Sequence, residues 1–400
     1  MTTLPEKSTT RRSFLIGGAA GGLLLSQRPV WGQSQKPIKI GALLPVTGVD
    51  PHEANSQING MKLYFEEVGW KVAGRPIEFL VEDDEFKPQV GMQKLRKLVE
   101  SDRIDILTGP VSSGVANAIV DYVKQTNTPW VISGAALASL TREKKGPLIF
   151  RTSTTTWQTN SPLGEWTAKN LAKEIVATAS DFAGGRDSVD EFKSSFAAAG
   201  GKVVKEVYPP LGSSDFSPYL ADIKSAKPAA VYCFFIGGDA VNFIKQYDQF
   251  GLKAEIPLVA SGFTVEGEFL PAQGRSALGV ISCLHYTDVL DTPVNKAFVA
   301  AYKARYGTTT SVQSDYGYVA ARFMVEALKA RDGSTENKDK LAEALREVSF
   351  EAPRGPVRFD PATHNVIQNE YIRKAVERDG RIANEVIATV TNVRDPGIRT

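Results

Sequence analysis

The sequence predicts an α/β fold made of two doubly wound parallel-sheet lobes joined by a hinge. Three observations carry this prediction: a length of 400 residues, an alternation of short apolar runs with longer amphipathic segments from residue 36 onward, and a restart of that alternation near residue 162. A single core usually stops growing near ~250–300 residues, so the length favours two cores. Alternating strands and helices need crossover connections, which place helices on both faces of a mostly parallel sheet.

In the first half of the chain, apolar runs predict strands and amphipathic stretches predict helices. One expected helix carries Ile58, Met61, Leu63 and Phe65 on its apolar side, and Pro88 suits the first turn of the next. The expected strands are 38–44, 77–82, 104–107, 130–133 and 148–151, and the expected helices are 55–68, 88–100 and 114–125.

The second half repeats this order and ends in a hairpin-like pair. The expected strands are 174–179, 202–207, 230–235, 256–260 and 279–284, with 357–359 and 369–376 as the closing pair. The expected helices are 162–173, 188–199, 216–224, 240–250, 293–306, 315–331 and 337–348. Parallel sheets of this kind bind ligands outside the carboxyl ends of their strands, so two facing sheets predict a ligand cleft between lobes that closes about a hinge.

The N-terminal residues have the pattern of an export signal. Two arginines, Arg11 and Arg12, precede an apolar, glycine-rich stretch over 15–25. This stretch is shorter than the ~20 residues that a membrane-spanning helix needs. We therefore expect residues 1–33 to be a twin-arginine signal peptide that is cleaved on export to the periplasm, and the alternative is an uncleaved N-terminal anchor.

Composition and motifs exclude several classes of function. The formal net charge is +2, and lysine and arginine form no block outside the N-terminal tail, so we expect no nucleic-acid partner. No second histidine follows His52-Glu53 at metal-ligand spacing, and there is no P-loop, dinucleotide fingerprint or nucleophile elbow. We therefore expect neither an enzyme nor a metal or other cofactor.

Both cysteines lie in apolar runs with strand character. Cys233 follows Val231-Tyr232, and Cys283 follows Ile281-Ser282. We expect two buried free thiols, although an oxidising compartment would permit a disulfide as the alternative.

Several short segments carry a family resemblance when they are taken together. They are GALLPVTG at 41–48, GMKL at 60–63, GRPIE at 74–78, VEDD at 81–84, GPVSS at 109–113 and FRTS at 150–153. From about residue 36 to 376 the chain resembles the extracellular solute-binding proteins of ABC importers, in the branched-chain amino-acid-binding family with the type I periplasmic binding fold.

The resemblance implies a domain organisation and a set of partners. The N-terminal lobe would hold 34–156 plus about 287–350, and the C-terminal lobe 157–286 plus about 351–390, with the ligand cleft between them. The partners would be a small-molecule ligand and an ABC permease in the cytoplasmic membrane, and we expect the protein to be a monomer.

The resemblance also implies which residues hold the ligand. Ser112 and Ser113, with the backbone of Ala135 and Ala136, would grip a carboxylate. A helix start with free N–H groups favours an anion. The alternative for the serines is an ordinary helix cap, and both roles are compatible.

The sequence departs from amino-acid binders at two positions. Leu137 stands where the family usually has a threonine, and Ser261-Gly262-Phe263 stands where an acid usually pairs with the ligand's ammonium. A buried ammonium without a partner is costly, so free α-amino acids are in doubt as ligands.

Aromatic residues occupy the corresponding strand ends in the second half. Phe182, Phe235 and Phe263 are expected to line the apolar part of the ligand, and core packing is the alternative for each one. The segments 234–243 and 354–360 also resemble members linked with aromatic acids. We therefore expect a small carboxylate ligand, an aromatic acid.

Three alternatives remain to this expectation. A branched-chain or other neutral amino acid would need Asp239 or Glu266 to supply the missing charge. A ligand sensor or an exported enzyme would belong to another functional class.

Overall fold

The computed structural model describes residues 36–48 and 51–398. The expected signal peptide, residues 1–33, lies outside the described residues. Within the described ranges, no helix combines the length and the apolar character that crossing a bilayer requires.

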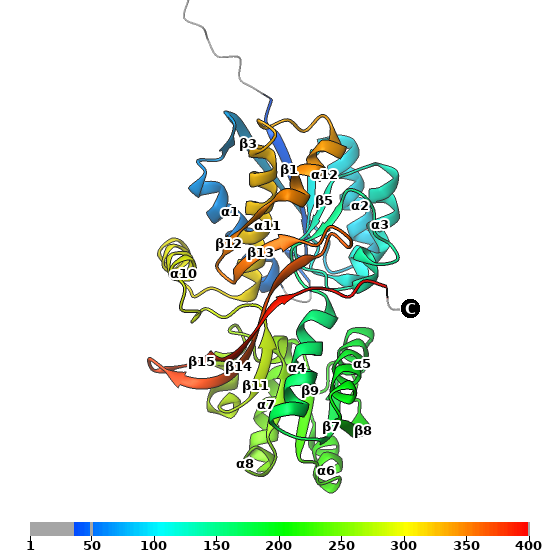
Figure 1. The fold of residues 1–400 in the computed structure, drawn as a ribbon, viewed down its shortest axis with the longest axis vertical. Helices are drawn as coiled ribbons and strands as arrows, with labels where there is room; N and C mark the ends of the chain where they lie inside the picture. Colours follow the sequence, from blue (N-terminus) through cyan, green and yellow to red (C-terminus); the bar gives the residue numbers. More distant parts are fainter. Residues whose placement is uncertain (1–35, 49–50, 399–400) are drawn as a thin grey trace, which may run out of the picture. The chain divides into compact units, whose positions relative to one another are not determined.

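The first sheet has six strands in the order β2-β3-β1-β4-β5-β6 (Figure 1). All neighbours pair in parallel except β2, which forms an antiparallel edge on β3. The strands are β1 Ile38–Leu44, β2 Lys71–Val72, β3 Arg75–Asp83, β4 Ile106–Thr108, β5 Trp130–Ile132 and β6 Ile149–Arg151.

Helices from both ends of the chain cover this first sheet. Buried side chains of β1 and α1 share one core with those of α10, α11 and α12, and we call this sheet with its helices the first lobe. The helices and turns are α1 Pro51–Glu67, α2 Pro88–Arg96, the π-helix Lys97–Asp102, α3 Ser113–Gln125, η2 Ala138–Thr141, α10 Pro293–Tyr306, α11 Val312–Lys329 and α12 Lys338–Glu347.

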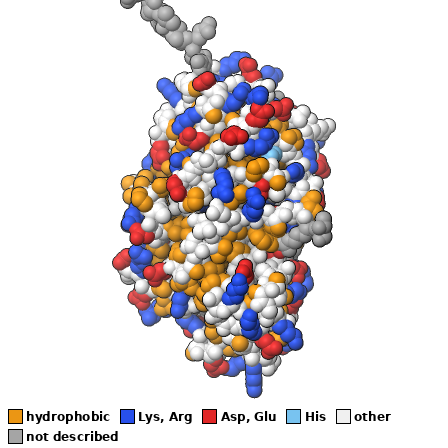
Figure 2. All heavy atoms as spheres, in the orientation of Figure 1, with side chains coloured by type: hydrophobic (Ala, Val, Ile, Leu, Met, Phe, Trp, Pro, Cys, Tyr) orange, Lys and Arg blue, Asp and Glu red, His pale blue; other side chains and the backbone are white. Residues whose placement is uncertain are grey.

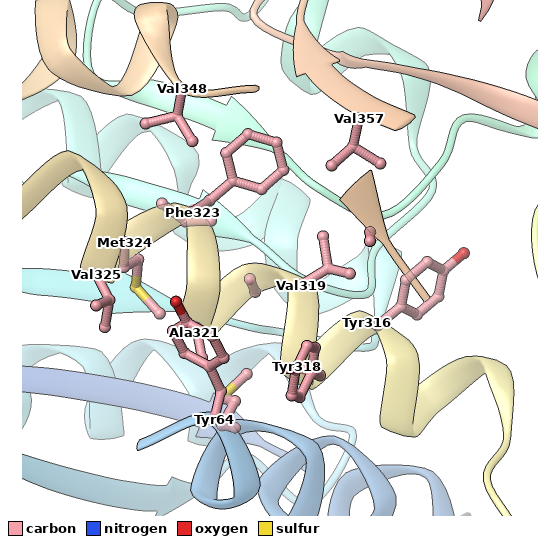
Figure 3. Close-up of a cluster of buried hydrophobic side chains, with 14 of the residues drawn as sticks. Tyr64, Tyr316, Tyr318, Val319, Ala321, Phe323, Met324, Val325, Val348 and Val357 are labelled. Carbon is pink, nitrogen blue, oxygen red and sulfur yellow. The ribbon is translucent and has the colours of Figure 1, made fainter. Parts of the chain in front are cut away.

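Helix α11 is the centre of that core. Figure 3 shows its side chains directed to several neighbours: Tyr318 lies beside Tyr64 of α1, and Phe323 lies toward Val348 and Val357. Tyr64 and Tyr318 meet edge to face at 5.1 Å. A helix that is apolar on most of its circumference is stable only when it is buried, and α11 satisfies this condition.

The second sheet has a parallel part with the order β8-β7-β9-β10-β11, followed by antiparallel strands. β14 pairs antiparallel with β11, β13 and β15. The strands are β7 Glu174–Ala179, β8 Lys202–Val207, β9 Ala230–Phe234, β10 Leu258–Ser261, β11 Ile281–Leu284, β12 Ser349–Ala352, β13 Gly355–Phe359, β14 Val366–Arg378 and β15 Arg381–Val393.

The helices between these parallel strands complete what we call the second lobe. They are α4 Thr156–Asn170, α5 Ala183–Ala198, α6 Ser217–Ser225, α7 Gly237–Gln249, α8 Leu252–Glu255, η3 Gly262–Val265, α9 Leu270–Gln273 and η4 Gly274–Ala277. The expected α/β class with two doubly wound sheets is confirmed.

The chain passes between the lobes at the link from β6 to α4, at the link from β11 to α10 and along β14, and β15 returns beside β14 toward the first lobe (Figure 1). Val366, near the start of β14, packs in the core of the first lobe, whereas Ile372 and Ala375 pack in the second. On the face shown in Figure 2, apolar side chains gather around the place where Figure 1 draws β14 and β15, and charges of both signs are scattered elsewhere.

The expected hairpin-like pair is confirmed in part. β13 and β14 are consecutive antiparallel strands that pair through Arg358–Ile367 and Phe359–Val366, but residues 369–376 of β14 pair with β15 and β11 instead. Strand β15 was not predicted, although its spaced Ile382, Val386 and Val390 follow the period of a half-buried strand.

Helix α4 begins six residues before the predicted start at 162. Thr155 accepts a hydrogen bond from the Gln158 backbone, and the Gln158 side chain accepts one from the Thr155 backbone. This capping box fixes the helix start, and Pro162 is accommodated inside the helix.

The two cysteines are free and buried, as expected. Cys233 pairs with Ala260 of β10, while Cys283 pairs with Ser261 of the same strand. A complete strand therefore separates them, which is about 10 Å and exceeds the span of a disulfide.

Candidate ligand-binding site

Both sheets have the strand order that creates a ligand crevice. In the first sheet the winding reverses between β1 and β4, and in the second sheet between β7 and β9. Ligands of doubly wound folds bind outside the carboxyl ends of the strands at such points. The loops that follow β4 and β7 therefore lie where a ligand is expected.

In the first lobe, the loop after β4 leads directly into helix α3. Ser112 is its N-cap, because the Ser112 Oγ accepts a hydrogen bond from the Val115 backbone at 3.3 Å. The helix-cap interpretation is thus confirmed for Ser112. Ser113, the first helical residue, is half-buried, and the positive end of the α3 dipole lies here.

A polar network ties the loop after β5 to two helices. Ser133 Oγ accepts a hydrogen bond from the Gly109 backbone at 3.2 Å and donates one to Gln57 Oε1 at 2.8 Å. Gln57 Nε2 donates in turn to Gln313 Oε1 at 2.7 Å. The backbone N–H of Ala135, next in the loop, donates to the Pro110 carbonyl at 2.8 Å, and Ala136 is half-buried. One of the expected ligand donors is therefore already used inside the loop.

In the second lobe, an aromatic pair lies at the switch point. Phe182, in the loop between β7 and α5, stacks on Phe234 at the end of β9, with ring centroids 6.1 Å apart. Phe182 is half-buried, whereas Phe234 is buried. Together they form an apolar surface beside the carboxyl end of the sheet.

Phe235 lies elsewhere. It is fully buried and packs against Phe216 at 5.3 Å and Phe243 at 4.2 Å in the core of the second lobe. Successive strand residues point to opposite faces, so the residue that shares a face with Phe182 is Phe234.

Phe263 is placed at the junction of the lobes. It follows β10 in the turn η3 and is half-buried, and its ring packs against apolar clusters of both lobes. The structure therefore brings Phe182 and Phe263 to partly accessible places at strand ends.

Two buried carboxylates lie near these strand ends, and the protein itself engages both. Asp239 Oδ2 accepts hydrogen bonds from Ser180 Oγ at 2.8 Å and from the Gly212 backbone at 3.0 Å. Glu266 Oε1 accepts one from the Val312 backbone at the start of α11, at 3.1 Å. Burial raises the pKa of Glu266 to about 7, although Arg373, with Nη1 3.5 Å from Oε2, opposes this shift.

The structure also shows a group of buried polar side chains between the lobes that the sequence did not reveal. They come from four separate parts of the chain, so no spacing could have indicated them: His285, Asp315, Tyr316, Arg354, Gln368 and Glu370. Over the described residues, no three histidine, cysteine, aspartate or glutamate side chains are grouped so as to hold a metal ion.

Comparison with known sequences identifies relatives over most of the chain. The periplasmic binding protein family matches residues 37–381. The Leu/Ile/Val-binding protein homolog 6 of Brucella melitensis biotype 1 is 31% identical over 368 residues, which cover 90% of this chain and 94% of the relative.

Comparison with solved structures gives the same result. An ABC transporter substrate-binding protein from Sphaerobacter thermophilus is 35% identical with a TM-score of 0.88, over 90% of this chain and 99% of that one. A solute-binding protein of an ABC transporter from Rhodopseudomonas palustris BisB5, in complex with 3,4-dihydroxybenzoic acid, is 34% identical with a TM-score of 0.85 over the same shares. The chain therefore belongs to the periplasmic binding protein family, and its fold is that of ABC-transporter solute-binding proteins.

Proposed function

We propose that this protein is the periplasmic solute-binding component of an ABC importer and captures a small aromatic carboxylate between its lobes. The ligand is delivered unchanged to a membrane permease, and the protein acts as a monomer without catalysis. The binding lobes are residues 34–156 plus about 287–350 and residues 157–286 plus about 351–390, of which Val357, Phe359 and Val366 pack in the core of the first lobe, and residues 1–33 direct export.

The ligand assignment rests on the different chemistry of the two switch points: one favours an anion, and the other is aromatic. The first lobe offers the start of α3 with Ser112 and Ser113, where backbone N–H groups and the helix dipole favour an anion. The second lobe offers the stacked rings of Phe182 and Phe234. A carboxylate attached to an aromatic ring matches both surfaces.

A free amino acid fits less well, because the two carboxylates that could pair with its ammonium group are already engaged. Asp239 and Glu266, which could have supplied the charge, already accept hydrogen bonds from the protein. Ser261 to Phe263, at the end of β10, contribute no charge at all.

The relatives support both ligand classes. Two solved solute-binding proteins from R. palustris, 34% and 30% identical to this chain, are complexes with benzoate and with 4-hydroxybenzoate. The Brucella relatives bear a Leu/Ile/Val-binding name, so a neutral amino acid is the second candidate ligand.

Titration calorimetry with benzoate, 4-hydroxycinnamate and leucine separates these candidates. We expect both aromatic acids to bind and leucine to produce no heat of binding. Phe182→Ala should weaken the aromatic acids about tenfold, because a ring contact beyond simple burial is lost. Phe250→Ala, which removes an exposed ring at the end of α7, is the matched control and should leave affinity unchanged. Binding of leucine alone would contradict the aromatic assignment.

A further inference from the structure

Six polar side chains meet between the two lobes, and none is more than 1% exposed. They come from the residue after β11, from α11, from the β12–β13 turn and from β14. We name them the crossing cluster: His285, Asp315, Tyr316, Arg354, Gln368 and Glu370.

The crossing cluster is contiguous. Gln368 Nε2 donates to Glu370 Oε1 at 2.9 Å, and His285 Nδ1 lies 3.9 Å from that oxygen. The ring of His285 stacks on Tyr316 with centroids 5.0 Å apart. The Arg354 guanidinium lies 5.7 Å from the Tyr316 ring centroid, and its Nη1 donates to Asp315 Oδ2 at 2.9 Å.

Many atoms of this cluster are buried without a hydrogen-bond partner. Within the part of the chain that the structure describes, these atoms are both ring nitrogens of His285, Tyr316 OH, Arg354 Nε, Asp315 Oδ1, Gln368 Oε1 and Glu370 Oε2. Buried polar groups in native proteins almost always have a partner in the protein, in ordered water or in a ligand. Such a concentration of unused donors and acceptors therefore indicates that a polar group from outside the chain binds here.

The crossing cluster is connected directly to a strand-end loop of the first lobe and through Arg373 to one of the second. Arg354 Nη2 donates to the Thr152 carbonyl, and the Thr152 backbone donates to Ile132, one residue before Ser133. On the other side, Arg373 of β14 donates through Nη1 to the carbonyl of Tyr286, next to His285, at 2.6 Å and through Nη2 to the Gly262 carbonyl at 3.1 Å, beside Phe263. The cluster thus lies next to the loops that approach the ligand from each lobe.

The protonation states of the cluster decide what it can bind. Burial raises the pKa of Glu370 to about 8, so the carboxyl group is protonated at neutral pH and can donate or accept. Burial, together with Arg354 and Arg373, lowers the pKa of His285 well below its usual value, so the ring has one donor and one acceptor. Tyr316 OH can also do either.

This combination of neutral donors and acceptors complements a hydroxyl group. A hydroxyl donates one hydrogen bond and accepts others, as these side chains require. An ammonium group only donates hydrogen bonds and carries a positive charge. The positive charges of Arg354 and Arg373 would repel it.

We propose that Tyr316, His285 and Glu370 form a subsite that binds a hydroxyl group on the ring of an aromatic acid, away from its carboxylate. This inference rests on the proposed function and names the substituent that the protein selects. Tyr316, directed away from α11 in Figure 3, is the central residue because its hydroxyl has no partner within the chain.

Titration calorimetry with benzoate and 4-hydroxybenzoate tests the subsite in the wild type, Tyr316→Phe and Tyr247→Phe. The wild type should bind 4-hydroxybenzoate at least about tenfold more tightly than benzoate, because one or two hydrogen bonds to buried groups are gained. Tyr316→Phe should remove this preference and keep the affinity for benzoate within twofold. Tyr247→Phe is the matched control: it removes another buried hydroxyl, which donates to the Ile256 carbonyl at 3.1 Å in the second lobe, and should keep the preference.

The possible failures are distinguishable. If neither acid binds the wild type, the proposed function is overturned and the subsite with it. If both acids bind but the wild type shows no preference, or Tyr316→Phe retains it, only the subsite is overturned. A crystal structure of the 4-hydroxybenzoate complex with water rather than the ring hydroxyl on Tyr316 would also overturn it. Thermal unfolding checks the variant itself: Tyr316→Phe should melt no lower than Tyr247→Phe, since it removes an oxygen that has no partner in the chain.

Discussion

Burial raises the pKa values of three acids between and beside the lobes toward or above neutral pH. Burial raises the pKa of Asp315 to about 6, of Glu266 to about 7 and of Glu370 to about 8, although Arg354 or Arg373 opposes each shift. The desolvation of a buried carboxylate exceeds what a neighbouring arginine restores. The charge of the region where the lobes meet therefore changes between about pH 6 and pH 8.

Replacing Glu370 with glutamine should alter the pH dependence of stability. The folded pKa of Glu370 lies above its unfolded value, so the protonated carboxyl contributes stability that is complete below about 4.5 and is lost as pH rises toward about 8. Glu370→Gln is neutral throughout. The free energy of unfolding of the wild type minus that of the variant should fall across this interval, as measured by urea denaturation at several pH values. A constant difference from pH 4 to pH 8 would show that Glu370 does not titrate as inferred.

Sequence patterns do not distinguish the two phenylalanines at 234–235. An aromatic strand end was expected there with Phe235 at the ligand, but the ring of Phe235 is in the core, and Phe234 stacks on Phe182. Adjacent phenylalanines in a strand are indistinguishable by composition, and only the register of the sheet decides which one faces the site.

Among the elements, the closest helix contact in the first lobe depends on two reciprocal glycines. A Cβ on Gly60 of α1 would lie 2.0 Å from the Ser314 carbonyl of α11, and a Cβ on Gly317 of α11 would lie 2.0 Å from the Gln57 carbonyl of α1. The backbones of α1 and α11 are therefore in direct contact at both glycines. This approach also holds Gln57 near Gln313, which links α1 to the loop after β5.

Gly317→Ala should separate α1 from α11 and lower the free energy of unfolding by about 1–3 kcal/mol, the usual cost of overpacking. Gly238→Ala in α7 is the matched control, because nothing lies within 4 Å of its added Cβ. There the better helix propensity of alanine should leave stability equal or up to about 1 kcal/mol higher. Urea denaturation of both variants measures the difference, and equal stabilities would contradict the close-contact argument.

Most elements could be predicted because each carries its own pattern. The strand 38–44 and the helix 293–306 were predicted with the observed bounds, since apolar runs and an N-terminal proline are local signals. The crossing cluster could not be predicted, because its members are brought together only by the packing of α11, β14 and the β12–β13 turn. Local sequence patterns thus predicted most elements and the serines at the start of α3. They could not predict contacts between distant parts of the chain.

For the whole molecule, the segment after β10 supplies contacts that join the two lobes. Glu266 reaches the start of α11, and Glu268 Oε1 accepts a hydrogen bond from Ser56 of α1 at 3.3 Å and lies 3.8 Å from His52. Contacts of this kind exist only while the lobes are close together. They should therefore stabilise the closed, ligand-holding form of a solute-binding protein.

Glu268→Ala should weaken ligand binding about two- to fivefold and leave the free energy of unfolding within about 0.5 kcal/mol of the wild type, because a partly exposed polar contact contributes about 0.2–1 kcal/mol. Glu377→Ala, which breaks an exposed pair with Arg275 inside the second lobe, is the control and should bind normally. Calorimetry and urea denaturation measure the two quantities. Equal affinities of the two variants would show that the Glu268 contacts do not stabilise the closed form.

Helices α10 to α12 enter the core of the first lobe although they follow the second sheet in the chain. During synthesis, the ribosome therefore releases all the parallel strands of both sheets before α11 exists to cover the first one. A nascent chain that ends before residue 293 would expose the apolar side of α1 and β1. The core of the first lobe can accordingly be completed only late in synthesis, and the earliest-made part of the protein depends on one of the last-made for its burial.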